Sequence, residues 1–189
     1  MAARPKGLGN TVVETFSQIM AEVSKHPAPR GEGNERVLRT YLKDLLFVGK
    51  LGWTPDKLIV GELFDLYAYD VVNSLVLYIE TKTPNSVTIP RDELEHFEEK
   101  LVRLGTCEYG AITNGHRFLF YRCFIKEGAV VAERQAEFDL DDLVNQVGGN
   151  KLPESSTKAI QVTFEYLTAG KYLGELEKPF AEGYGRVVP

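Results

Sequence analysis

The chain has 189 residues, of which 43% are apolar and 26% are charged, and its net charge at pH 7 is −5. This length fits one domain with a terminal extension, and the composition is that of a globular protein. The negative charge argues against a free-standing DNA-binding protein of high affinity, because contacts with phosphates dominate such affinity.

The sequence predicts neither a membrane segment nor a signal peptide. No apolar run approaches the roughly 20 residues that a membrane helix needs, and residues 1–7 lack the apolar core of a signal peptide. Cys107 and Cys123 flank a predicted hairpin and could lie close together, but we expect buried free thiols. A cytoplasmic protein without a membrane partner is therefore expected.

The first part of the chain predicts two helices. Apolar residues recur at helical spacing over residues 10–25, and the Pro-rich and Gly-containing segment 27–31 breaks this helix. A second helix is expected over residues 34–48, with Asn34 as its N-cap. Glu35 lies at the edge of the apolar stripe of this second helix instead of on its polar face.

Strands dominate the middle of the chain. After a loop over residues 49–56, two strands are predicted over residues 61–69 and 75–82, separated by loop residues 71–74. A helix over residues 91–104 follows, with its apolar residues at helical spacing.

A hairpin is predicted after this helix. A buried strand over residues 109–113 leads through the two-residue turn Asn114-Gly115 into a strand over residues 117–122. A weaker strand over residues 129–133 completes the sheet. This order of helices and strands predicts an α/β fold, with a central mixed β-sheet flanked by helices.

The last part of the chain predicts a short helix over residues 140–147, a hinge at residues 148–150 and an additional C-terminal helix over residues 154–173. The end of the chain has the composition of a linker. The expected division is an N-terminal helix and connector (1–33), a core (34–150), a C-terminal helix (151–177) and a linker-like tail (178–189).

Three charged residues at the ends of apolar strands, Asp65, Glu80 and Lys82, are costly to place there. If residues 71–74 form the loop of an antiparallel hairpin, Asp70 faces Leu75 and Asp65 lies opposite Glu80. Opposed Cβ atoms are ~4.5–5.5 Å apart, so the two like charges repel unless a cation lies between them. Magnesium prefers such oxygen ligands, and Lys82 projects to the same face as Glu80. A shift of one residue in the pairing would remove this convergence.

These residue types suit the hydrolysis of phosphodiesters. A metal ion polarises a phosphoryl oxygen and lowers the pKa of bound water, and Lys82 would orient that water or stabilise negative charge. Glu35 would join through a second metal or a water if its helix packs over the strand ends. For an isolated Asp…Glu-x-Lys pattern, a chance arrangement of an edge aspartate and an exposed ion pair explains the residues better.

The surrounding pattern resembles the PD-(D/E)xK nuclease superfamily. Asp65 is followed by Glu80-Thr81-Lys82 at the end of an apolar strand, then by a helix and a buried strand. The helix that carries Glu35 and the segment Thr113-Asn114-Gly115 resemble one branch of that superfamily. This branch comprises the N-terminal nuclease domains of type I restriction motor subunits and of fused methyltransferase-nucleases. The resemblance covers residues 34–147 and implies a restriction-endonuclease-like core.

The resemblance also implies roles for the site residues. Asp65 and Glu80 would be metal ligands, the Thr81 carbonyl a third ligand, Lys82 the catalytic lysine and Glu35 an accessory acid. It implies Mg²⁺ as the cofactor, with Mn²⁺ as a substitute, and double-stranded DNA as the substrate. Other domains or subunits, of the methyltransferase, helicase/translocase or specificity type, would recognise or move the DNA.

The chain departs from the family pattern at three places. Phe64 stands where the family often has proline, and His96 and Lys100 stand where a glutamine and a tyrosine are common in the third helix.

His116 has no predicted partner and is expected to be solvated. Local positive charge toward DNA would come from Arg36, Arg39 and Lys43 on the second helix, or from Lys100 and Arg103 on the third, but a solvated helix face explains these residues equally well.

Two other interpretations remain open. A module that has kept the nuclease fold without its activity would bind DNA or a partner protein, in line with the net charge and the altered third helix. An unrelated α/β scaffold would leave Asp65, Glu80 and Lys82 apart, whereas a shared metal needs the two carboxylates within ~6 Å of each other.

Overall fold

The structure is a computed structural model that describes residues 7–26, 32–61, 65–105, 107–148 and 154–173. Four predicted features fall outside these residues. They are the break at residues 27–31, the part of the first strand at residues 62–64, the hinge residues 149–150 and the tail at residues 178–189.

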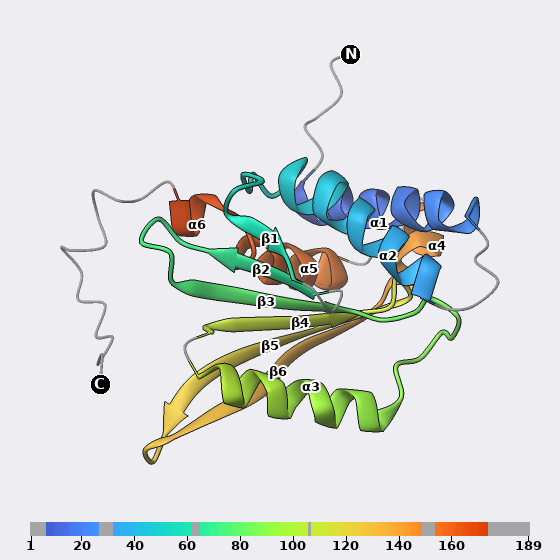
Figure 1. The fold of residues 1–189 in the computed structure, drawn as a ribbon. Helices are drawn as coiled ribbons and strands as arrows, with labels where there is room; N and C mark the ends of the chain where they lie inside the picture. Colours follow the sequence, from blue (N-terminus) through green and yellow to red (C-terminus); the bar gives the residue numbers. More distant parts are fainter. Residues whose placement is uncertain (1–6, 27–31, 62–64, 106, 149–153, 174–189) are drawn as a thin grey trace.

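A sheet of six strands crosses the described part of the protein in the order β1 to β6 (Figure 1). The strands are β1 (Leu58–Val60), β2 (Asp65–Tyr69), β3 (Leu75–Thr81), β4 (Tyr109–Thr113), β5 (Arg117–Lys126) and β6 (Ala129–Asp139). Neighbours are antiparallel except β3 and β4, which run parallel because α3 (Arg91–Leu104) crosses between them. The predicted α/β fold with a mixed sheet is confirmed, whereas its likeness to a restriction endonuclease stays a prediction.

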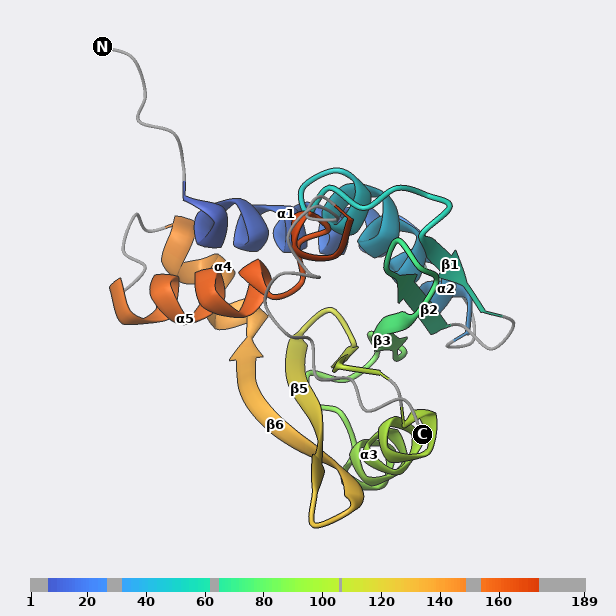
Figure 2. The same cartoon turned by 90° about the vertical axis from the view of Figure 1, so that its left-hand side faces the viewer.

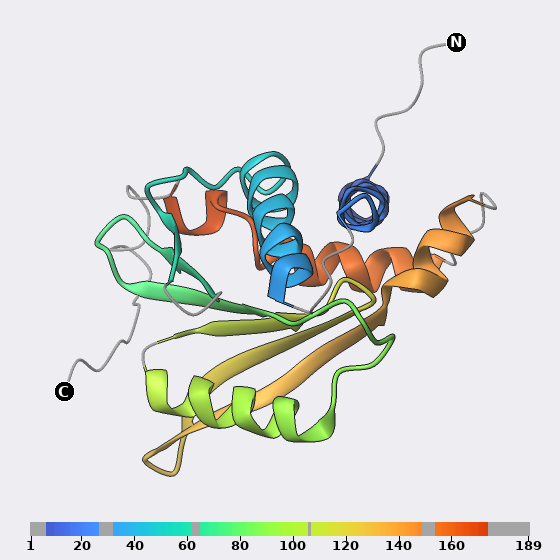
Figure 3. The same ribbon diagram turned by 45° about the vertical axis from the view of Figure 1, so that its right-hand side comes forward.

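Helices cover both faces of the sheet (Figure 3). α3 covers one face. The opposite face carries α1 (Leu8–Ser24), α2 (Glu32–Tyr41), the π-helical segment η1 (Leu42–Val48), α4 (Leu140–Gly148), α5 (Glu154–Glu165) and α6 (Gly170–Leu173).

Two apolar cores result from the alternation of side chains along the strands. On β5, Phe118 faces the core under α1, whereas Tyr121 faces the core under α3. Phe16 of α1 packs edge-on against Phe118 and Phe164, with ring centroids 5.9 and 6.1 Å apart. The helices near both ends of the chain therefore share one core with the sheet.

The second helix differs from its predicted form at both ends. It begins at Glu32, so Asn34 lies within α2 and is not its N-cap. The last part of this helix, η1, has the wider turn of a π-helix, and the adjacent side chains of Leu46 and Phe47 are both buried there.

The β2–β3 hairpin has the predicted alignment at its open end but not at its turn. Asp65 pairs with Glu80 as predicted, whereas a bulge places Tyr69 opposite Leu75, where Asp70 was expected. Oδ1 of Asp70 accepts hydrogen bonds from two backbone N–H groups of the turn, at 3.0 and 2.8 Å. These bonds draw Asp70 out of the ladder and into the turn.

β5 and β6 extend beyond their predicted ends, to Lys126 and Asp139, and the tip of their hairpin passes α3 (Figures 1 and 2). Glu127 and Gly128 form the turn with φ of 52° and 83°, which matches the twist of the flanking strands. The unpredicted parts, the outer end of β5 and residues 134–137 of β6, are largely exposed, so no apolar alternation marks them in the sequence.

The predicted helix over residues 154–173 is broken into α5 and α6 by contacts with the loop before β1. The Trp53 indole N–H donates to the Leu167 carbonyl at 2.7 Å. The Ala169 N–H donates to the Leu51 carbonyl at 2.8 Å. The Leu167 carbonyl and the Ala169 N–H, which a continuous helix would pair internally, thus bind this loop. The loop leads into β1, an edge strand that was not predicted.

Candidate functional site

Two buried carboxylates and two lysines lie together at one end of the β2–β3 pair. Asp65 and Glu80, which are 3% and 5% exposed, stand opposite each other. Lys82 Nζ lies 2.7 Å from Glu80 Oε1. Lys100 Nζ lies 2.6 Å from Asp65 Oδ2 and 3.4 Å from Glu80 Oε2. Since one ammonium contacts both carboxylates, they meet the expected separation of ~6 Å. The predicted convergence of Asp65, Glu80 and Lys82 is confirmed.

Tyr78 orients Glu80 from the same face of β3. Side chains two residues apart on a strand point the same way, and Tyr78 Oη donates a hydrogen bond to Glu80 Oε2 at 2.6 Å. Burial and this bond raise the pKa of Tyr78, so the phenol keeps its proton at neutral pH. Phe97 of α3 stacks on Tyr78 with ring centroids 5.7 Å apart. The position of Glu80 therefore depends on how α3 packs.

The partners of Glu80 keep its carboxylate ionised. Burial favours the protonated form, but hydrogen bonds from Lys82 and Tyr78 outweigh burial and lower the pKa of Glu80. Burial would also lower the pKa of Lys82 and Lys100, but their carboxylate partners outweigh it and raise both values. Both lysines are therefore charged at neutral pH.

Glu35 lies beside this cluster, because α2 begins over the ends of the strands. Thr83 Oγ1 donates to Glu35 Oε2 at 3.3 Å. Burial raises the pKa of Glu35, although the Thr83 hydrogen bond and the charges of Lys82 and Arg39 act against the rise. A carboxylate with a raised pKa is a better proton acceptor near neutral pH. Its role as an accessory acid stays a prediction.

α3 contributes two charged residues for which the sequence indicated no role at the site, Glu93 and Lys100. Glu93 Oε2 lies 3.2 Å from Lys82 Nζ. Both residues share the side of α3 that carries the buried Phe97, because positions three, four and seven apart lie on one helix face. The helical spacing of Glu93 and Lys100 relative to Phe97 was the feature of the sequence that could have indicated their position. His96 is exposed, which agrees with a surface residue.

The carboxylate oxygens of Asp65 and Glu80 are of the kind that a magnesium ion prefers. Mg²⁺ is commonly held by one or two carboxylates and retains several waters. The third predicted ligand is the carbonyl of Thr81, the buried last residue of β3. In the described ranges, which omit Glu62, no three His, Cys, Asp or Glu side chains form a preformed metal site. Waters or substrate oxygens would therefore have to complete the coordination.

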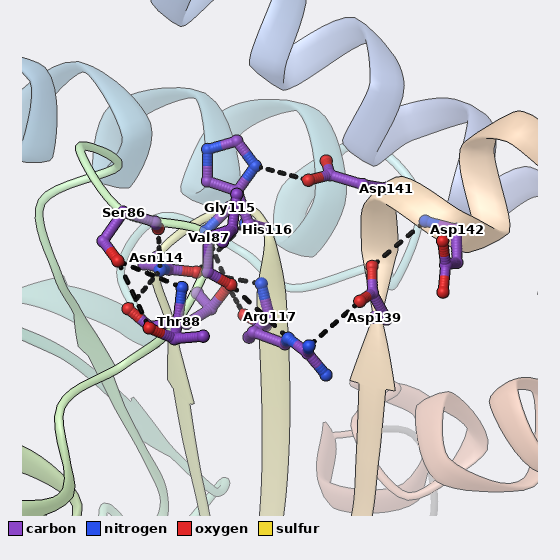
Figure 4. Close-up of polar contacts among 11 residues, drawn as sticks. Ser86, Val87, Thr88, Asn114, Gly115, His116, Arg117, Asp139, Asp141 and Asp142 are labelled. Atoms are coloured by element: carbon purple, nitrogen blue, oxygen red, sulfur yellow. Dashed lines mark hydrogen bonds and ion pairs between the residues drawn. The ribbon is translucent and has the colours of Figure 1, made fainter.

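Asn114 ties the loop after β3 to the turn between β4 and β5 (Figure 4). Its Nδ2 donates to the carbonyls of Ser86 and Thr88, at 2.7 and 3.4 Å. Its Oδ1 accepts from the N–H groups of His116 and Arg117, at 3.1 and 2.8 Å. This loop begins with Lys82 and Thr83, directly after β3, so Asn114 anchors the segment that leaves the site.

The turn itself differs from the predicted two-residue hairpin. The nearest opposed residues are Thr113 and Phe118, with residues 114–117 between them. The side chain of Asn114 closes this longer turn, as Asn side chains commonly do. Gly115 has a φ of 86°, and a Cβ there would collide with the Met20 side chain. α1 thus packs directly on the turn.

His116 and Arg117 connect the same turn to the start of α4 (Figure 4). His116 Nδ1 lies 2.8 Å from Asp141 Oδ2, and Arg117 Nη2 lies 3.1 Å from Asp139 Oδ2. The expectation that His116 is solvated was wrong, because α4 brings a distant aspartate to it.

Replacement of Asn114 by alanine is expected to lower the free energy of unfolding by about 1–3 kcal/mol, because partly buried backbone groups of the loop and of the turn lose their partners. Urea denaturation followed by circular dichroism measures this loss. The matched control is Asn85→Ala, at an exposed position of the same loop, which should change stability by about 0.5 kcal/mol or less. Equal losses in the two variants would contradict the anchoring role of Asn114.

The basic residues considered as sources of positive charge toward DNA do not lie together. Some are buried or belong to the site, and the others lie on the surface. Arg39 is buried, and burial lowers the pKa of its guanidinium. Lys100 contacts Asp65. Arg36 and Arg103 are exposed and Lys43 is half-buried, so they remain as surface charge.

No protein-family model, curated protein or solved structure matches the chain. Among the described residues, no helix is long and apolar enough to cross a membrane.

Proposed function

We propose that this chain is a Mg²⁺-dependent endonuclease domain that hydrolyses phosphodiester bonds of double-stranded DNA. The observation that supports this proposal is the convergence of Asp65, Glu80 and Lys82 at one end of two paired strands. Two carboxylates opposite each other can share a divalent cation, and a lysine beside them suits the chemistry of phosphoryl groups. Mn²⁺ would substitute for Mg²⁺.

Each residue of the site would have a separate chemical role. Asp65, Glu80 and the Thr81 carbonyl would hold the metal, which when bound polarises a phosphoryl oxygen and lowers the pKa of water. Lys82, held between Glu80 and Glu93, would stabilise the negative charge that develops on the phosphate. Glu35, with its raised pKa, would accept a proton.

The net charge of −5 favours a cleavage module that depends on other parts of a larger restriction-modification enzyme. Phosphate contacts supply most of the affinity for DNA, and two lysines of the site, Lys82 and Lys100, are engaged by its carboxylates. Methyltransferase, helicase/translocase or specificity domains or subunits would supply the missing DNA contacts.

A second candidate is a catalytically inactive nuclease-fold module that binds DNA or a partner protein. It is favoured by one observation, the contact of Lys100 with both carboxylates. A permanent internal ion pair would make a metal unnecessary for the stability of this site.

Calorimetric titration with Mn²⁺ tests the proposed metal site. The wild-type chain should bind Mn²⁺, and Asp65→Asn should weaken binding by about tenfold or more, because one of two charged ligands is lost. Asp56→Asn, at an exposed loop position, is the matched control and should bind like wild type. Absence of binding, or equal binding by Asp65→Asn, would contradict the proposal.

Cleavage of supercoiled plasmid in Mg²⁺, compared with the same reaction in EDTA, separates the two candidates. Metal-dependent nicking by the wild-type chain favours the endonuclease. Absence of both Mn²⁺ binding and cleavage, also when the chain is part of its complete enzyme, favours the inactive module, because the Lys100 ion pair already neutralises the carboxylates.

A further inference from the structure

The ammonium of Lys100 lies between the two carboxylates proposed to hold the metal. Its Nζ lies 2.6 Å from Asp65 Oδ2 and 3.4 Å from Glu80 Oε2. It also stands 4.8 Å from the centroid of the Tyr78 ring. Lys100 thus serves as the cation that the opposed carboxylates need.

The two lysines of the site use different oxygens of Glu80. Lys82 contacts Oε1 and reaches outward to Glu93. Lys100 contacts Oε2, the oxygen that also accepts the Tyr78 hydrogen bond, and joins it to Asp65. A divalent ion that bridges Asp65 and Glu80 would compete with Lys100 for both carboxylates, whereas Lys82 could keep its contact.

The side chain of Lys100 can leave this position without rearrangement of the fold. It is 29% exposed and extends from α3, where the buried Phe97 and Leu101 hold the helix on the sheet. A lysine has a flexible four-carbon stem and a compact charge, so its ammonium can move to solvent while the helix stays in place.

We propose that Lys100 is a built-in competitor of the metal, which holds the Asp65–Glu80 pair in the metal-free protein and is displaced when a divalent ion binds. This inference rests on the proposed metal site. Lys100 is therefore a positioning residue of the metal-free state. Its displacement makes the site bind metal more weakly than its two carboxylates would by themselves.

The test is a Mn²⁺ titration of the wild-type chain, Lys100→Met and Arg103→Met. Lys100→Met keeps an apolar stem but removes the competing charge, and it should bind Mn²⁺ about tenfold more tightly, a gain of about 1.4 kcal/mol. Arg103→Met removes one positive charge from the same helix at a side chain that is 69% exposed. Its affinity should stay within about twofold of wild type, since exposed charges are screened by salt.

A thermal melt gives a readout that does not depend on activity. Without metal, Lys100→Met should melt at a lower temperature than wild type, because its carboxylates repel each other. Saturating Mn²⁺ should raise its melting temperature by more than it raises that of wild type. If Lys100→Met does not fold, Lys100→Gln replaces it, because glutamine keeps a hydrogen-bond donor for Asp65 without the charge.

The outcomes separate this inference from the metal site itself. If wild type binds Mn²⁺ through Asp65, and the neutral Lys100 variant binds it equally or more weakly, Lys100 is not a competitor and the metal site stands. If neither wild type nor the neutral variant binds Mn²⁺, both proposals are overturned.

Discussion

Replacement of Lys82 by alanine is expected to slow Mg²⁺-dependent DNA cleavage by about 10²–10⁴-fold, while binding of Mn²⁺ is retained. Preorganised groups that stabilise charge or transfer protons contribute effects of this size. Lys82 is preorganised by Glu80 at 2.7 Å and by Glu93 at 3.2 Å. Because its amine is not a metal ligand, the variant separates catalysis from metal binding. Initial rates of plasmid nicking and a calorimetric titration measure the two properties.

Arg91→Ala is the matched control for Lys82→Ala. Arg91 is 92% exposed at the start of α3, and among the ion pairs of the described residues it pairs only with Glu95. Exposed pairs contribute little, so the cleavage rate of Arg91→Ala should stay within about twofold of the wild-type rate. Circular dichroism checks that both variants are folded. Equal cleavage by wild type and Lys82→Ala would refute the catalytic role of this lysine.

Replacement of Phe97 by alanine is expected to lower the free energy of unfolding by about 3–5 kcal/mol. Phe97 is fully buried. It stacks on Tyr78 at 5.7 Å and meets Tyr121 edge-on at 5.4 Å. Its loss leaves a cavity between α3 and the sheet. Chemical denaturation followed by circular dichroism measures the change.

Phe97→Ala also bears on the site, because Tyr78 orients Glu80 and α3 carries Lys100. A cavity under Tyr78 should therefore weaken Mn²⁺ binding as well as stability. The control is Val102→Ala on the same helix, at a side chain that is 40% exposed, with an expected loss of about 0.5 kcal/mol or less. A loss below 1 kcal/mol in Phe97→Ala would show that α3 is not held by this packing.

The strands β2 and β3 and the pairing of Asp65 with Glu80 were predictable because both depend on local sequence. A short connection between two apolar strands makes an antiparallel hairpin the simplest arrangement, and alternation then places alternate residues on one face. The bulge near Tyr69 lies on the turn side of the site, so it changed the pairing of Leu75 without affecting Glu80. The helix over residues 91–104 was also predictable, since its apolar residues follow helical spacing.

Features that depend on contacts between distant segments were not predictable from the same patterns. The break between α5 and α6 comes from bonds to the Trp53 loop, more than a hundred residues earlier in the chain. His116 finds Asp141 only because α4 packs beside the turn. The local periodicity of the sequence predicts neither contact, because each depends on how whole elements pack against one another.

The α/β order and the opposition of Asp65 and Glu80, with Lys82 on the same face, follow from strand periodicity and one short loop of the sequence. The surroundings of these residues come from the packing of distant elements. This packing places the Lys100 ammonium between the carboxylates, Glu93 beside Lys82, and Glu35 against Thr83. The reason is physical: the first set is fixed by backbone geometry over a few residues, whereas the second depends on how α2 and α3 pack on the sheet.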